Sequence, residues 1–379
     1  PSAPHFILLF TTILSECTSL SAPRGYSASI LMQHMRHRMY LPSGICKSVT
    51  WRTGEHLLRP RSCASFAHAA QLNYQQAPTD GLRLGRYLVA PTHYQYDCVD
   101  TQVPTSVKMH NARDLPNAAT LDSAGFTLHR WPTSCENFLD DFEVVRKYYD
   151  EMRKLVMDVS GANLVLIFDH KVRHSSSSTD GSVRSPVERV HCDYSEDSAP
   201  QWLEQLLENG VFSHGRKRML NKAEGKRLLG LDFAFINVWR SIDSMAPIRQ
   251  SPLAVCDASS VSKSDQLYYE IHYPIYDGEM HENYGLRFNE KHRWYYYPQM
   301  VKDECLIFKQ YDKRSEVPQF VFHTAFDDQL ATAAAPARQS IEVRTVAFFL
   351  KGAAEQEDVL QTKLHFRKGR IVRRRSPHE

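Results

Sequence analysis

Closely spaced cysteines are absent from this chain. It has eight cysteines in 379 residues, but no two lie closer than seventeen residues and there is no Cys-x-x-Cys motif. This spacing argues against a zinc knuckle or a dithiol redox site. Free thiols in a reducing compartment fit the pattern best.

A long hydrophobic run is also missing. The apolar run at residues 6–14 has only about half the length of a helix that spans a bilayer, so no membrane partner is expected. The residues that follow are rich in Ser, Arg and His and nearly free of acidic groups, as in an organellar transit peptide. We therefore predict that residues 1–70 form a poorly ordered or transit-like extension. We predict a cytoplasmic location, with organellar targeting by this extension left open.

The charge excess is small. The formal net charge is +3, too little to indicate a nucleic-acid partner. Residues 1–70 hold two acidic groups against seven Lys and Arg, and the end of the chain is strongly basic. The body between them is therefore slightly acidic, as in many soluble enzymes. We predict one domain over residues 71–352 and a basic tail over 353–379, with a homodimer as a possible assembly.

The pattern of apolar residues predicts a mainly β protein with flanking helices. An apolar stripe predicts a helix over residues 136–158, started by a capping box of Thr133 and Glu136 and ended before Gly161. Shorter helices are expected near 200–210 and 217–229, and mobile or connecting loops over 173–182 and 331–337. Strands are expected over 164–168, 233–239, 267–273, 294–297, 305–311, 319–326 and 341–350. This succession is typical of a double-sheet barrel with helices on one side.

The segment 190–194 carries the clearest chemical signal. His191 and Asp193 are two residues apart, so on an extended strand they point to the same side and can bind one metal ion. The pair alone is weak evidence, because both residue types are abundant. A further histidine, His323, is followed fifteen residues later by Arg338 and then by Ser340.

Two imidazoles and one carboxylate leave three adjacent positions open on an octahedral ion. Non-haem Fe(II) oxygenases use those positions for a bidentate co-substrate and dioxygen. The same ligands with one water could serve a zinc hydrolase. Arg338 and Ser340 favour the oxygenase, because a guanidinium and a hydroxyl on one strand face suit the distal carboxylate of 2-oxoglutarate.

The third ligand is not fixed by spacing. His272 and His292 lie in or near expected strands and His281 lies in an expected loop, and a lone histidine on an aromatic strand is more often a core residue. His323 is preferred because an arginine follows it at a suitable distance and because of a family resemblance.

That resemblance rests on several motifs together over about residues 80–350. They are Val-His-Cys-Asp-Tyr at 190–194, Ile-Asn-Val-Trp-Arg at 236–240, Pro-Leu-Ala-Val-Cys-Asp at 252–257, Trp-Tyr-Tyr-Tyr-Pro-Gln-Met at 294–300, Phe-Lys-Gln-Tyr-Asp at 308–312, His-Thr-Ala-Phe at 323–326 and Arg-Gln-Ser-Ile-Glu-Val-Arg at 338–344. The chain resembles the fungal hydroxylase/desaturase family of secondary metabolism, which is similar to the CmcJ-like proteins and includes AsaB-type oxygenases.

The resemblance implies a jelly-roll, cupin-like double-stranded β-helix, Fe(II), 2-oxoglutarate, dioxygen and oxidation of a small-molecule substrate by hydroxylation, desaturation or oxidative cyclisation. It makes His191, Asp193 and His323 the iron ligands and Arg338 the main 2-oxoglutarate anchor. Further candidates to bind the co-substrate are Ser340, Asn237, Trp239 and Arg240. Alternation places Arg240 on the strand face opposite Asn237 and Trp239, so these three side chains cannot share one pocket unless the strand bulges.

Several alternatives remain open at this stage. Arg344 and Lys309 are other candidate anchors, although surface ion pairs would also explain them. The aromatic run 294–297 is a candidate substrate wall or simply core. The rival functions are a zinc-dependent hydrolase with the same His/Asp/His site and a non-catalytic cupin-like protein.

Overall fold

A computed structural model describes residues 67–79, 81–88, 97–173, 186–209, 222–273, 279–332 and 334–352. Most of the predicted extension, the whole of the predicted basic tail, most of the predicted loop 173–182 and the start of the predicted helix 217–229 lie outside these residues. No helix in the described part of the chain is long and apolar enough to cross a membrane.

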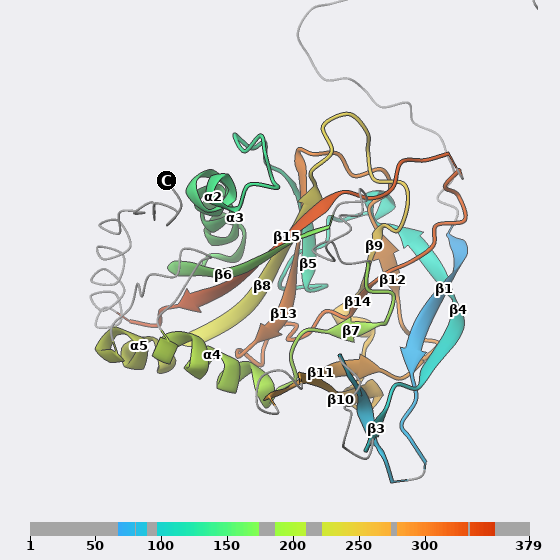
Figure 1. The fold of residues 1–379 in the computed structure, drawn as a ribbon, viewed down its shortest axis with the longest axis horizontal. Coiled ribbons are helices and arrows are strands. Elements are labelled where there is room, and N and C mark those ends of the chain that lie inside the picture. The colour runs from blue at the N-terminus through green and yellow to red at the C-terminus, as the bar shows by residue number, and fades with distance from the viewer. Residues whose placement is uncertain are drawn as a thin grey trace, which may run out of the picture. The chain divides into compact units, whose positions relative to one another are not determined.

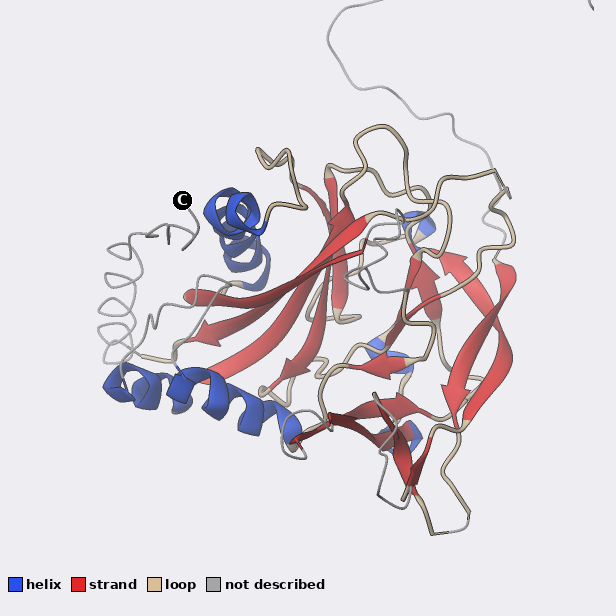
Figure 2. Ribbon diagram, in the orientation of Figure 1, coloured by secondary structure: helices blue, strands red, loops and turns tan. Residues whose placement is uncertain are grey.

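Two β-sheets form the body of the protein (Figures 1 and 2). The larger has the strand order β1-β4-β12-β9-β14-β7-β11-β10-β2-β3 and the smaller the order β5-β13-β8-β15-β6. The larger contains β1 (His68–Gln75), β2 (Arg83–Tyr87), β3 (Cys98–Val99), β4 (Gln102–Asn111), β7 (His191–Cys192), β9 (Leu253–Cys256), β10 (Gln266–Tyr273), β11 (Glu279–Leu286), β12 (Trp294–Tyr296) and β14 (His323–Ala325). The smaller contains β5 (Phe126–Arg130), β6 (Leu164–Arg173), β8 (Asp232–Ser241), β13 (Glu304–Asp312) and β15 (Ser340–Phe349). The prediction of a mainly β fold with flanking helices is confirmed.

One predicted strand is much shorter than expected. The pattern predicts a strand over 319–326, but β14 has only three residues. Just before it, the Val321 amide donates to Lys309 of the smaller sheet, while the Phe322 carbonyl accepts from Cys256 of the larger sheet. The segment therefore passes from one sheet to the other, and His323 begins the strand directly after this crossing.

The long predicted helix starts later than expected. α2 (Asp141–Glu143), a π-helical segment (Val144–Tyr148) and α3 (Tyr149–Ser160) follow one another, and the first is capped by Asp140. The predicted capping box is wrong, because no helix begins there: the Thr133 hydroxyl donates to Glu151 and accepts from the Cys135 amide, while the first helical residue is Asp141. The helix ends where predicted, with Gly161 in a left-handed conformation.

α3 covers one face of the smaller sheet (Figure 1). Its buried residues, including Tyr149, Met152 and Val156, pack against Ile236 and Val343 of the central strands. This is the supporting role expected from its single apolar stripe. The other face of the same strands is therefore left for the core between the sheets and for polar groups.

α4 (Ser198–Asn209) and α5 (Lys222–Leu229) pack against each other at the lower left in Figure 1. Leu203 and Leu207 of α4 are buried in a core that includes Phe235 of β8. The two helices approach closely at Gly225, where an added Cβ would lie 2.9 Å from the Leu207 carbonyl oxygen. The start of α4 agrees with the helix predicted near Pro200.

Candidate metal centre

Long-range strand pairing brings His191, Asp193 and His323 together. His191 begins β7 and Asp193 follows it, while His323 begins the neighbouring antiparallel strand β14. The two histidines are direct register partners, and their ring centroids are 4.3 Å apart. All three side chains are therefore presented from two adjacent strand ends.

The three ligand atoms lie near the spacing that a single ion requires. They all lie within 4.8 Å of one another, and Nε2 of His191 is 3.7 Å from Oδ1 of Asp193. Ligand bonds of about 2.0–2.2 Å place the donor atoms on one ion roughly 3 to 4.4 Å apart. A small inward movement of the three side chains would bring all three ligand atoms onto one metal ion.

Both histidines are held in the tautomer that a metal needs. Nδ1 of His191 lies 2.7 Å from the Arg189 carbonyl oxygen, and Nδ1 of His323 lies 3.3 Å from that of Val321. An imidazole that donates from Nδ1 to a carbonyl keeps the lone pair on Nε2 for a metal. Burial and the neighbouring His323 and Arg189 also lower the pKa of His191 well below its ordinary value, so this ring is neutral.

The second oxygen of Asp193 is held by the smaller sheet. Oδ2 accepts a hydrogen bond of 3.1 Å from the Asn237 amide and lies 3.4 Å from Nε of Arg344. Burial alone would raise the pKa of Asp193, but the positive charge of Arg344 and the hydrogen bond from Asn237 hold this pKa below its ordinary value. The carboxylate is therefore ionised. Its other oxygen, Oδ1, lies beside Nε2 of His191 and is available to a metal ion.

Gln310 braces the same ligands from β13. It is the extra residue of a β-bulge, since Lys309 lies opposite Ile236 and Tyr311 opposite Phe235. Its Oε1 accepts from the Asp193 backbone amide at 2.7 Å. Its Nε2 lies 3.4 Å from Nδ1 of His323, a contact but no hydrogen bond when Nδ1 carries the proton. Bulges are frequent beside active sites because they redirect side chains.

One face of the paired strands β8 and β15 lies beside the three candidate ligands, and we call this face the floor of the site. Register pairs Arg344 with Asn237 and Glu342 with Trp239. The Asn237 amide also donates to Glu342 at 2.7 Å. Asn237 therefore links the metal-ligand carboxylate to a second carboxylate on the same floor.

Arg338 lies just before β15 as a buried cation with a free donor. It is 8% exposed, and its Nη1 donates to the Ser251 carbonyl at 2.6 Å. Its guanidinium carbon is 5.5 Å from the centroid of the Trp239 ring. Neither Arg338 Nε nor Ser340 Oγ has a hydrogen-bond partner among the described residues. Burial lowers the pKa of Arg338 to about 10, and a carboxylate at this position would offset that cost.

Arg240, the remaining co-substrate candidate, lies on the opposite face of β8. It is fully buried, donates to the carbonyls of Trp131 and Lys302, and its guanidinium lies 5.6 Å from the Tyr148 ring centroid. β8 has no bulge against β15, so strict alternation separates Arg240 from Asn237. The structure does not bring Arg240 to the metal centre.

The two alternative anchors are already paired with carboxylates. Lys309 is buried and lies 2.8 Å from Asp312 and 3.2 Å from Asp122. Arg344 pairs with Asp193 and, at 3.3 Å, with Asp169. Nε of Arg344, like Nε of Arg338, has no hydrogen-bond partner among the described residues, but the charge of Arg344 is already paired with two carboxylates.

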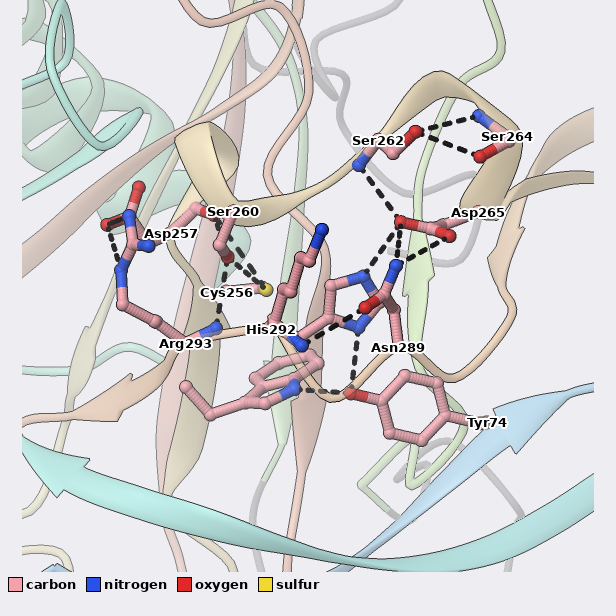
Figure 3. Close-up of polar contacts among 12 residues, drawn as sticks. Tyr74, Cys256, Asp257, Ser260, Ser262, Ser264, Asp265, Asn289, His292 and Arg293 are labelled. Carbon is pink, nitrogen blue, oxygen red and sulfur yellow. Dashed lines mark hydrogen bonds and ion pairs between the residues drawn. The ribbon is translucent and has the colours of Figure 1, made fainter.

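The other histidines have other partners. His292 lies in a buried network in which its Nε2 is 3.3 Å from Asp265 and its Nδ1 is 3.1 Å from the Tyr74 hydroxyl, which accepts from Trp294 (Figure 3). His272 pairs with Glu270 at 2.8 Å, and the His281 ring packs against Trp202. Within the described ranges, one group of His, Cys, Asp or Glu side chains is close enough to hold a metal ion, and it consists of His191, Asp193 and His323.

Gln310, Glu342 and Ser251 are residues of the site that the sequence patterns do not single out. A glutamine inside an aromatic strand is a usable signal for Gln310, but alternation does not predict the bulge that directs it. Glu342 lies between Ser340 and Arg344 on one predicted strand face, so its place was available from the sequence. Nothing in the local sequence indicates that Ser251 contacts Arg338.

This fold and centre define a candidate metal-binding protein built on two sheets. The sequence profile described as "Oxidoreductase/YMDC permease-like domain" matches residues 72–348. The chain therefore belongs to this family.

Named relatives refine the class. The chain is 29% identical over 308 residues to the hydroxylase/desaturase efuI of Hormonema carpetanum, covering 73% of this chain and 94% of the relative. It is 28% identical over 268 residues to the Fe(II)/2-oxoglutarate-dependent dioxygenase nvfI of Aspergillus novofumigatus, covering 69% and 90%. The solved structure of the iron and alpha-ketoglutarate-dependent endoperoxidase NvfI superposes with a TM-score of 0.63 at 25% identity, covering 75% of this chain and 98% of that chain.

These similarities confirm the predicted fungal hydroxylase/desaturase resemblance and the jelly-roll core. The chain is an oxidoreductase of the Fe(II)/2-oxoglutarate-dependent dioxygenase class, and the predicted cofactors are those of its relatives.

Proposed function

We propose that this chain oxidises a small organic molecule, by hydroxylation, desaturation or oxidative cyclisation, at an iron held by His191, Asp193 and His323. The observation that carries the proposal is the convergence of these three ligand atoms within 4.8 Å. Arg338, a buried cation with an unpartnered donor, lies over the ring of Trp239, which shares a strand face with Asn237, and serves 2-oxoglutarate.

The donor set fits iron. When bound, Fe(II) supplies the oxidative decarboxylation of 2-oxoglutarate by dioxygen and the removal of a hydrogen atom from a substrate carbon. The chain would hold this ion through His191, Asp193 and His323. Asn237 and Arg344 hold Oδ2 of Asp193, so the carboxylate offers one oxygen to the metal and leaves adjacent positions open.

The co-substrate site is assigned to Arg338 and Ser340. Their unpartnered Nε–H and hydroxyl donors suit the distal carboxylate of 2-oxoglutarate. Trp239 lies against the guanidinium and excludes water from it. A zinc hydrolase with the same ligands would have no use for this buried cation and its unpartnered donor.

Other expectations remain predictions. They are a possible homodimer, the lack of a nucleic-acid partner, a cytoplasmic location and the domain limits at residues 71 and 352. The aromatic run 294–297 gains no support as a substrate wall, because Trp294 and Tyr296 are buried in the core.

The test is anaerobic reconstitution with Fe(II) and 2-oxoglutarate, recording the visible metal-to-ligand charge-transfer band. Wild type should give the band, His323→Ala should lose it, and Arg338→Ala should need a higher 2-oxoglutarate concentration. His272→Ala is the matched control, since His272 pairs with Glu270 away from the ligands. A wild-type protein that binds iron but gives no band would overturn the proposal.

A further inference from the structure

Ser251 has a backbone conformation that its sequence does not favour. Its φ is 45°, in the left-handed region, which non-glycine residues rarely adopt. It also precedes Pro252, and the residue before a proline is steered toward extended conformations with negative φ. A conformation opposed by local preference persists only where the surrounding structure holds it.

The carbonyl of this residue meets the proposed co-substrate anchor. The Ser251 oxygen accepts from Nη1 of Arg338 at 2.6 Å, and the Trp239 ring lies against the guanidinium. The carbonyl and the ring together fix one nitrogen and one face of the planar guanidinium of Arg338. The Nε–H of Arg338 stays without a partner among the described residues, and the carbonyl, being neutral, does not compensate the positive charge.

We propose that Ser251 is a positioning residue for 2-oxoglutarate. Its left-handed backbone turns the carbonyl onto Arg338, which holds the guanidinium in place while its Nε–H remains available to the carboxylate of the co-substrate. This inference rests on the proposed function. It assigns to a serine outside the ligand motifs the task of fixing the anchor before the co-substrate arrives.

The acceptor is a backbone atom, so the effect of substitution should follow backbone preference and not side-chain polarity. Glycine adopts positive φ without strain and asparagine tolerates it, whereas a β-branched valine strongly resists it. Ser251→Gly and Ser251→Asn should therefore keep the contact. Ser251→Val should lose it, although the carbonyl itself is chemically unchanged.

The experiment titrates 2-oxoglutarate into the anaerobic Fe(II)-loaded full chain and takes the Kd from the charge-transfer band. Ser251→Val should bind about tenfold more weakly, the usual effect of losing one hydrogen bond to a charged group. Ser251→Gly and Ser251→Asn should stay within about twofold of wild type. Gln299→Val is the matched control, because Gln299 also has a positive φ, of 52°, and is exposed. It should lose thermal stability and keep the wild-type Kd.

A second background separates positioning from general damage. In an Arg338→Ala chain, Ser251→Val should cause no further loss of 2-oxoglutarate affinity, because the guanidinium that it positions is gone. Equal weakening in both backgrounds, or wild-type affinity in Ser251→Val, would overturn the inference while leaving the proposed function intact. If wild type itself shows no 2-oxoglutarate-dependent band, the proposed function fails and this inference fails with it.

Discussion

Replacing Asn237 by leucine should loosen the metal site without unfolding the protein. Leucine is close to asparagine in shape, but it cannot donate to Oδ2 of Asp193 or to Glu342, at 3.1 and 2.7 Å. A hydrogen bond to a charged group contributes about 1.5–3 kcal/mol, and 1.4 kcal/mol corresponds to a tenfold change in affinity. The loss at Asp193 alone should therefore weaken metal binding roughly 10- to 100-fold, which agrees with typical effects of outer-shell partners.

The assay is competition between the protein and a chromogenic chelator for Fe(II) under anaerobic conditions, repeated with redox-inert Mn(II). Unfolding by urea should be measured on the metal-free chains. We expect Asn237→Leu to lose about 1–3 kcal/mol of stability, because two buried carboxylates each lose a donor. Its folded fraction at room temperature should remain high enough for the metal titration.

Thr345→Val provides the matched control. Thr345 is buried on the neighbouring strand and donates to the Ile236 carbonyl at 2.7 Å, on the face away from the metal ligands. It should lose comparable stability and keep the wild-type affinity for Fe(II). The reasoning would be refuted if Asn237→Leu bound Fe(II) as tightly as wild type, or if Thr345→Val weakened binding equally.

Three further predictions concern residues outside the metal site. Arg240→Met should lose about 1–3 kcal/mol in urea unfolding, because buried carbonyls lose their donor, yet keep the 2-oxoglutarate Kd; a changed Kd would place Arg240 in the site. Burial lowers the pKa of His292, so the unfolded chain takes up a proton below about pH 6.5 before the folded chain does. His292 therefore stabilises the fold above that pH, and this contribution is lost as the pH falls through the lower pKa of the folded state. His292→Gln should flatten the dependence of the unfolding free energy on pH between about 5 and 7. An unchanged slope would contradict this prediction. Gly225→Ala should reduce thermal stability by about 1–3 kcal/mol, because the new methyl group meets the Leu207 carbonyl at 2.9 Å; a stabilised variant would show that the helices move apart freely.

The sequence predicts local directions well and long-range partners poorly. Alternation correctly places His191 and Asp193 on one side of an extended segment, and Arg240 on the other side of β8 from Asn237. It cannot predict that His323 lies directly opposite His191, because that depends on the pairing of strands far apart in the chain. The choice of His323 over His292 accordingly needed the family resemblance.

The errors have equally specific physical causes. Thr133 and Glu136 have the spacing of a capping box, but Glu151 of α3 captures the Thr133 hydroxyl and Asp140 caps the first turn. Tertiary contacts thus override a local signal. The strand predicted over 319–326 is interrupted because its backbone bonds are divided between the two sheets, which a period-2 pattern cannot reveal.

Register explains why one strand can serve both the core and the metal site. On β8, Asn237 and Trp239 face the site while Ile236 and Val238 pack beneath α3. A slip by one residue would exchange these two sets. The bulge at Gln310 adds one residue to β13 alone, so Gln310 reaches the metal ligands without shifting β8.

Gln310→Met tests this use of the bulge. Methionine matches glutamine in length, but it leaves the Asp193 amide without its 2.7 Å acceptor. Because the backbone of Asp193 is then less firmly held, we expect Fe(II) affinity to fall about tenfold. Arg338 does not contact Gln310, so the 2-oxoglutarate Kd at saturating iron should stay near wild type. Unchanged iron affinity would show that the β7 backbone is fixed by strand pairing alone, whereas a parallel loss of 2-oxoglutarate affinity would show that the bulge shapes the whole floor and not only the ligands.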